Sequence, residues 1–97
     1  MSAIPGKKIK CLVWDLDQTL WSGILLEGDP VALRPGVRET IIELDKRGIL
    51  QSIASQNDPD LALEQLRAWG LVKYFLHPQF DLVADKASQI ANIRHVL

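Results

Sequence analysis

The sequence has a single cysteine, Cys11, so the chain cannot form an internal disulfide, and one cysteine cannot by itself hold a metal ion. It has no surplus of basic residues: 11 Lys and Arg against 12 Asp and Glu give a net charge of −1. That charge provides no general field for attracting nucleic acid. No apolar run approaches the roughly 20 residues of a membrane-spanning helix. We therefore expect no nucleic-acid or membrane partner.

The composition is otherwise that of an ordinary globular protein, with 47% hydrophobic and 24% charged residues. A chain of 97 residues has room for one domain, which we expect to cover 1–97. The N-terminus lacks the apolar core of a secretory signal. The single cysteine and this lack of a signal predict a reducing, cytoplasmic location.

Predicted strands and helices alternate along the chain. Short apolar runs that stop at polar residues predict strands, the third closed by Pro78, at 11–14, 49–54 and 75–78. Apolar residues at three- to four-residue spacing predict helices at 35–48, 59–70 and 85–97. Turn residues within 24–30 predict a small hairpin or flap. This order predicts an α/β fold with a parallel sheet, which binds ligands at the carboxyl ends of its strands.

Two acidic residues, Asp15 and Asp17, directly follow the first predicted strand. Carboxylates this close repel each other unless a cation bridges them or one is protonated for acid chemistry. Mg²⁺ favours oxygen ligands and is commonly shared between carboxylates and a substrate phosphate. An Asp-x-Asp pair alone is more often a turn or a helix cap, so the neighbouring residues decide its interpretation.

The neighbouring residues resemble the first motif of the haloacid dehalogenase (HAD) superfamily. That motif is a hydrophobic strand followed by Asp-x-Asp-x-Thr, here Leu12-Val13-Trp14-Asp15-Leu16-Asp17-Gln18-Thr19-Leu20. Ser55 matches the second motif, a Ser or Thr that ends the next strand. Lys86 matches the third, a Lys near the start of a later helix. The resemblance implies a Rossmann-like fold, parallel sheet with flanking helices, and a Mg²⁺-dependent phosphatase or phosphotransferase.

The resemblance also implies a role for each of these residues. Asp15 would attack phosphorus and become an aspartyl phosphate, while Asp17 would protonate the leaving oxygen and then activate water. Ser55 would donate a hydrogen bond to a phosphoryl oxygen, and Lys86 would neutralise charge on the transferring group. Mg²⁺ would be held by the Asp15 carboxylate and the Asp17 main-chain carbonyl.

The superfamily's fourth motif, acidic residues that complete the metal shell, follows the lysine helix, and this sequence stops at Leu97. We therefore expect a domain truncated before that motif. Either the chain is a fragment of a longer enzyme, or the acid comes from elsewhere, or activity is lost. Asp81 and Asp85 precede Lys86, so we interpret them as a turn residue and a helix cap. An uncovered sheet edge would also favour a homo-oligomer.

A narrower resemblance, to the capless FkbH-like branch of the superfamily, covers nearly the whole chain. It rests on Lys10-Cys11-Leu12-Val13, Leu20-Trp21-Ser22-Gly23-Ile24, Ala54-Ser55-Gln56-Asn57-Asp58 and His77-Pro78-Gln79. Better-known members of that branch load a glyceryl unit from a phosphoglycerate onto an acyl carrier protein in polyketide synthesis, a transfer that involves a cysteine thiol. Cys11 lies about 13 Å from Asp15 along a strand, so we interpret it as a buried structural cysteine.

Other functions and contacts stay open. Small capless phosphatases of sugars or phosphotyrosine match the same motifs, and a non-catalytic docking module that keeps the fold is a third alternative. Contacts with a phosphorylated small-molecule substrate are predicted for Trp21, Asn57 and Thr19. Thr19 is better placed to brace its loop. His77 could orient a substrate, but a half-buried histidine at a strand end is the commoner case. Arg34 and Arg38 could meet an anionic substrate, but an exposed position in solvent explains them better.

Overall fold

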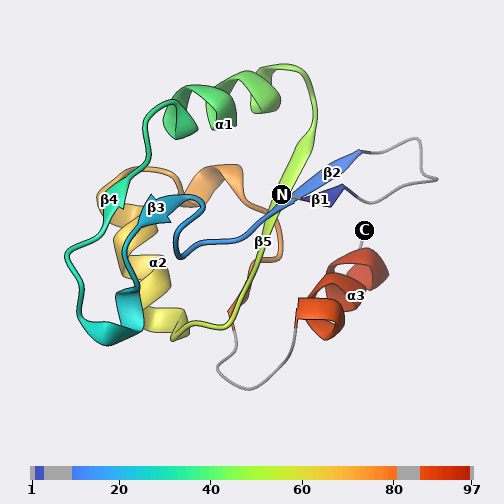
Figure 1. Cartoon of the computed structure of the whole chain (residues 1–97). Helices are drawn as coiled ribbons and strands as arrows, with labels where there is room; N and C mark the ends of the chain where they lie inside the picture. The colour runs from blue at the N-terminus through green and yellow to red at the C-terminus, as the bar shows by residue number, and fades with distance from the viewer. Residues whose placement is uncertain (1, 4–9, 81–85, 97) are drawn as a thin grey trace.

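The computed structural model describes residues 2–3, 10–80 and 86–96, and in this part of the chain four strands form one sheet in the order β1-β2-β5-β6 (Figure 1). The strands are β1 (Ser2–Ala3), β2 (Cys11–Trp14), β5 (Leu50–Ser55) and β6 (Gln79–Phe80). β5 pairs in parallel with both β2 and β6, whereas β1 is antiparallel to β2. The predicted α/β fold with a parallel sheet is confirmed.

Helices cover both faces of this sheet. α1 (Val37–Lys46) and α2 (Pro59–Ala68) lie on one face, and α3 (Lys86–Val96) lies on the other (Figure 1). Successive strand residues point to opposite faces. Trp14 and Ile53 therefore join the apolar cluster under α1 and α2, while Val13 and Ala54 pack against Ile93 of α3. The sheet is buried on both sides, as its continuous apolar strands predicted.

The residues predicted to cap the helices lie at the helix ends in the structure. Asp58 caps α2, its side chain accepting a hydrogen bond from the Leu61 amide. Gly48 ends α1 with φ +74°, a left-handed conformation that glycine adopts without strain. α1 begins only at Val37, because Gly36 has φ +82° and cannot be part of a right-handed helix. The predicted helices are confirmed, with small differences at their described ends.

The prediction of a third strand at 75–78 is wrong. The chain there passes from the 3₁₀ helix η2 (Val72–Tyr74) into a bend in which His77 has φ +45°. β6 starts after Pro78, where Gln79 pairs with Ala54. His77 is exposed in this bend, not half-buried at a strand end.

The predicted flap at 24–30 is a 3₁₀ helix, η1 (Leu25–Glu27), between two short antiparallel strands. These are β3 (Trp21–Ser22) and β4 (Ala32–Leu33). The Asp29 carboxylate accepts a hydrogen bond from the Ile24 amide and closes the turn. Within 10–80 and 86–96, no helix combines the length and apolarity needed to cross a membrane.

Candidate active site

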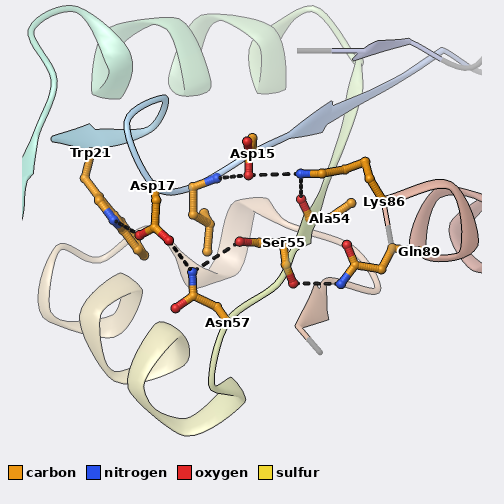
Figure 2. A network of polar contacts seen from close by, with 9 residues as sticks. Asp15, Asp17, Trp21, Ala54, Ser55, Asn57, Lys86 and Gln89 are labelled. Atoms are coloured by element: carbon orange, nitrogen blue, oxygen red, sulfur yellow. Dashed lines mark hydrogen bonds and ion pairs between the residues drawn. The ribbon is translucent and has the colours of Figure 1, made fainter. Parts of the chain in front are cut away.

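A cavity of about 400 Å³ opens where β2 and β5 end and α3 begins. The parallel register pairs Trp14 with Ile53, so the residues that follow each strand emerge side by side. The cavity is lined by Asp15, Asp17, Ser55, Gln56 and Lys86. The structure thus brings together all four residues predicted to be catalytic, although they are up to 71 positions apart in the sequence. Figure 2 shows how their side chains converge.

The two carboxylate oxygens of Asp15 have different surroundings. Oδ1 accepts a hydrogen bond from the Leu16 amide at 2.8 Å and forms an ion pair with Lys86 Nζ at 2.9 Å. Oδ2 receives no hydrogen bond from the residues that the structure describes. Because the side chain is 47% exposed and lines the cavity, Oδ2 is the oxygen available to attack an electrophile there.

Lys86 reaches the cavity from the first residue of α3. Its ammonium group donates to the Ala54 carbonyl as well as pairing with Asp15 (Figure 2). The two paired side chains are 43% and 47% exposed, and ion pairs this accessible to water contribute about 1 kcal/mol or less to stability. The main effect of the Lys86–Asp15 ion pair is to place a positive charge beside the carboxylate.

Asp17 is held through both of its oxygens. Oδ1 accepts hydrogen bonds from Trp21 Nε1 at 2.9 Å and from the Leu25 amide at 3.1 Å. Oδ2 accepts from Asn57 Nδ2 at 3.1 Å. The carboxylate thereby ties its own loop to β3, to the start of η1 and to the segment that leads into α2.

The loop between the two aspartates and β3 is fixed by Gln18. This residue has φ +61°, which is uncommon outside glycine and turns the chain sharply. Arg34 Nη1 donates to the Gln18 carbonyl at 2.6 Å, and the Gln18 side chain accepts from the Gly23 amide at 3.2 Å. Arg38 similarly donates to the Trp69 carbonyl at 2.8 Å. Both arginines bind main-chain carbonyls, so these contacts explain them without an anionic ligand.

The structure corrects the three predicted substrate contacts. Trp21 is completely buried and packs against Trp69 with ring centroids 5.8 Å apart, so it cannot form a substrate wall. Thr19 lines a different pocket, next to the start of α1. Asn57 is completely buried behind the cavity and is not among its lining residues. None of the three is placed to touch a substrate in the cavity.

Cys11 is 2% exposed near the opposite end of β2 from the cavity. Burial raises the pKa of its thiol, which disfavours the reactive thiolate at neutral pH. The interpretation as a buried cysteine is confirmed. Asp81 and Asp85 lie outside the described residues.

Sequence reasoning missed Gln56, which lines the cavity, and Gln89, which is completely buried. Gln89 Nε2 donates to the Ser55 carbonyl at 2.7 Å (Figure 2). Lys86, Gln89 and Ile93 recur at spacings of three and four, which puts them on one face of a helix. A glutamine on the same helix face as the apolar Ile93 was the available signal. Gln89 therefore links α3, the helix of Lys86, to the end of β5 at Ser55.

We expect Gln89→Glu to destabilise the protein more than Gln89→Leu does. The leucine loses one hydrogen bond but also removes Gln89 Oε1, a buried acceptor without a partner among the described residues, so about 1 kcal/mol is lost. The glutamate would place a charge beside a carbonyl oxygen and cost more. Thermal unfolding checks this order, with a shift of about 4–8 °C per kcal/mol for a domain of this size. Equal melting temperatures for the two variants would contradict the assigned contact.

No family model and no curated protein match the sequence. Two solved structures resemble the fold. The first is an uncharacterized protein from Listeria monocytogenes serotype 4b, with 21% identity, TM-score 0.73, and 89% of this chain and 60% of that chain covered. The second is the N-terminal part of protein BF1531 from Bacteroides fragilis, which contains a phosphatase domain complexed with Mg. It has 24% identity and TM-score 0.74, over 94% of this chain and 28% of that chain.

These likenesses establish the fold, a mixed α/β architecture with a parallel sheet between helices. The chain spans less than two thirds of the length of either matched protein.

Proposed function

We propose that this chain forms the front part of a Mg²⁺-dependent phosphoryl-transfer site of the HAD type, in which Asp15 is the nucleophile that cleaves phosphate monoesters. The observation that carries the proposal is the convergence of Asp15, Asp17, Ser55 and Lys86 on one cavity, where Asp15 Oδ2 receives no hydrogen bond from the described residues. The likeness to a phosphatase domain complexed with Mg supports it.

The proposed reaction has two displacements. Asp15 Oδ2 forms a bond to phosphorus as the ester P–O bond breaks, and the leaving oxygen takes a proton from Asp17. A water oxygen then attacks the aspartyl phosphate, giving its proton to Asp17 as the bond between phosphorus and Asp15 breaks. Ser55 Oγ and Lys86 Nζ bind the phosphoryl oxygens and balance their charge.

Mg²⁺ fits the donor set of this site. The Asp15 carboxylate and the Asp17 main-chain carbonyl provide hard oxygen ligands, and the described residues contain no group of three His, Cys, Asp or Glu side chains that would make a fuller cage. Mg²⁺ commonly keeps several waters and takes one or two carboxylates together with substrate phosphate oxygens. When bound, the ion supplies positive charge to the transferring phosphoryl group.

The narrower proposal is the FkbH-like activity, transfer of a glyceryl unit from a phosphoglycerate to an acyl carrier protein in the cytoplasm. Because Cys11 is buried, the thiol for such a transfer has to come from the carrier or from another polypeptide segment. Hydrolysis of small sugar phosphates or phosphotyrosine is the alternative that needs no thiol. An activity assay with these phosphate esters and an acyl carrier protein distinguishes the two activities, because only the FkbH-like activity transfers a glyceryl unit to the carrier.

We expect a saturable, Mg²⁺-dependent change in tryptophan fluorescence when beryllofluoride, a mimic of the phosphoryl group, is added to the chain. Trp21 is a suitable reporter because its indole nitrogen is bonded to Asp17, which lines the cavity. The change should be absent in Asp15→Asn. If fluorescence does not respond and no phosphate ester is hydrolysed, the chain is a non-catalytic module that keeps the fold.

A further inference from the structure

Asn57 occupies a position between two of the proposed catalytic residues without reaching the cavity itself. It lies two residues beyond β5 and directly before Asp58, the cap of α2. Its side chain is completely buried. Nδ2 donates to Asp17 Oδ2 at 3.1 Å and to Ser55 Oγ at 3.2 Å (Figure 2). A single amide group therefore joins the loop after β2 to the end of β5.

The donor and acceptor roles follow from the chemistry of the groups. An amide nitrogen carries two hydrogens and cannot accept, so one hydrogen goes to the Asp17 carboxylate and the other to the Ser55 oxygen. Ser55 Oγ thus acts as an acceptor toward Asn57. Its own hydroxyl hydrogen is left to be donated elsewhere, and Ser55 lines the cavity where a phosphoryl oxygen would bind.

The oxygen of the Asn57 amide, Oδ1, is not paired in the same way. Oδ1 is buried and has no hydrogen-bond partner in the described part of the chain. A buried acceptor without a partner destabilises a fold. Rotating the amide by half a turn would not help, because it would set Oδ1 against the Asp17 carboxylate and the Ser55 oxygen. The orientation is therefore dictated by the two residues at the site, and it leaves Oδ1 without a partner among the described residues.

We propose that Asn57 is a positioning residue that holds the Asp17 carboxylate and the Ser55 hydroxyl in a fixed relation for phosphoryl transfer. The inference rests on the proposed function, in which Asp17 protonates the leaving oxygen. Trp21 and the Leu25 amide hold only Oδ1 of Asp17, so Asn57 supplies the contact that ties Oδ2 to β5. Loss of that contact impairs proton delivery, and the loss is greatest when the leaving group depends most on being protonated.

The test measures kcat and KM for a para-nitrophenyl and a glyceryl phosphate ester at saturating Mg²⁺, together with melting temperature. For Asn57→Leu we expect kcat/KM, which reports the step in which the leaving group departs, to fall about 100-fold with the glyceryl ester and about 10-fold with the nitrophenyl ester, whose leaving group needs little protonation. KM should change less than about threefold, because Asn57 does not touch substrate. The melting temperature should fall by about 4–8 °C, because two hydrogen bonds are lost while the buried Oδ1, which has no partner among the described residues, is removed as well.

Two further variants complete the design. Asn57→Asp keeps the shape but replaces the donor with a carboxylate, which repels Asp17 and accepts the Ser55 hydrogen, so we expect it to be at least as impaired as Asn57→Leu. If Asn57→Leu does not fold, Asn57→Ser, with one donor in place of two, provides the comparison between the esters. Asn92→Asp is the matched control, because Asn92 is exposed and bonds only to Gln79 among the described residues.

The outcomes separate the inference from the function on which it rests. An equal loss of kcat/KM with both esters, or a rise in KM with kcat intact, overturns the positioning role and leaves the proposed function in place. A wild-type chain that turns over neither ester, while a verified Mg²⁺-dependent phosphatase does so in the same assay, overturns both. A larger loss of kcat/KM with the glyceryl ester, with KM unchanged and the variant still folded at the assay temperature, supports the role.

Discussion

Asp15→Asn is expected to lower kcat for any phosphate ester by more than about 10³-fold, because an amide oxygen is a poor nucleophile and the covalent intermediate cannot form. The asparagine retains the shape of the side chain and an oxygen that can still accept the Leu16 amide. KM and kcat for each accepted ester are measured with purified variant and wild-type proteins under identical Mg²⁺ conditions.

The fold should tolerate this substitution. Asp15 is 47% exposed, and its ion pair with Lys86 is accessible to water, so its loss changes stability by about 1 kcal/mol at most. Asp45→Asn is the matched control, since Asp45 is exposed on α1 away from the cavity lining. A folded Asp15→Asn protein that retains more than about a tenth of wild-type kcat would refute the nucleophile assignment.

The sequence predicted the part of the site that depends on local pattern. Asp15 and Ser55 each end an apolar strand, and the carboxyl ends of parallel strands meet at one sheet edge, so their proximity follows from the fold. Lys86 starts a helix, as expected, and the structure places that helix against the same edge. Periodicity located the ends of these strands and of this helix, and the resemblance to the HAD motifs selected the three residues there.

The predicted substrate contacts of Trp21 and Asn57 were wrong because they depend on the direction of the side chain, which sequence periodicity does not encode. Trp21 follows a polar loop and was expected at the surface of the site, but its large ring is buried against Trp69, 48 positions later. Burial of so much apolar area outweighs the advantage of an exposed position beside a substrate. Asn57 was expected to touch substrate, yet its side chain turns inward to meet Asp17 and Ser55. Side-chain direction after a strand depends on tertiary contacts.

The buried polar residues form a supporting layer behind the cavity. Asn57 and Gln89 each donate to Ser55, one to its hydroxyl oxygen and the other to its carbonyl oxygen. They come from opposite sides of the sheet, because Asn57 leads into α2 and Gln89 belongs to α3. Each also leaves its side-chain oxygen buried without a partner among the described residues. The end of β5 is therefore fixed from both faces, at some cost in stability.

Lys86→Met is expected to lower kcat by about 10²–10³-fold while lowering the melting temperature by only a few degrees. Methionine keeps a long unbranched side chain but removes the charge that balances the phosphoryl oxygens in the transition state. The lost contacts are the ion pair with Asp15 and the hydrogen bond to the Ala54 carbonyl, both made by a side chain that is 43% exposed. Water can replace the exposed ion pair, so stability depends little on it. The Ala54 carbonyl belongs to a completely buried residue, and the loss of its donor accounts for the few degrees.

The comparison with Lys46→Met distinguishes a local effect from a general loss of positive charge. Lys46 lies in the last turn of α1, is exposed and does not line the cavity. We expect it to retain wild-type kcat. If Lys86→Met instead unfolds well below the wild-type melting temperature and its kcat falls only in proportion to the folded fraction, Lys86 is a structural anchor for α3. An intact fold with a large loss of kcat means that the ammonium group acts on the substrate, since neither an exposed ion pair nor net charge accounts for it.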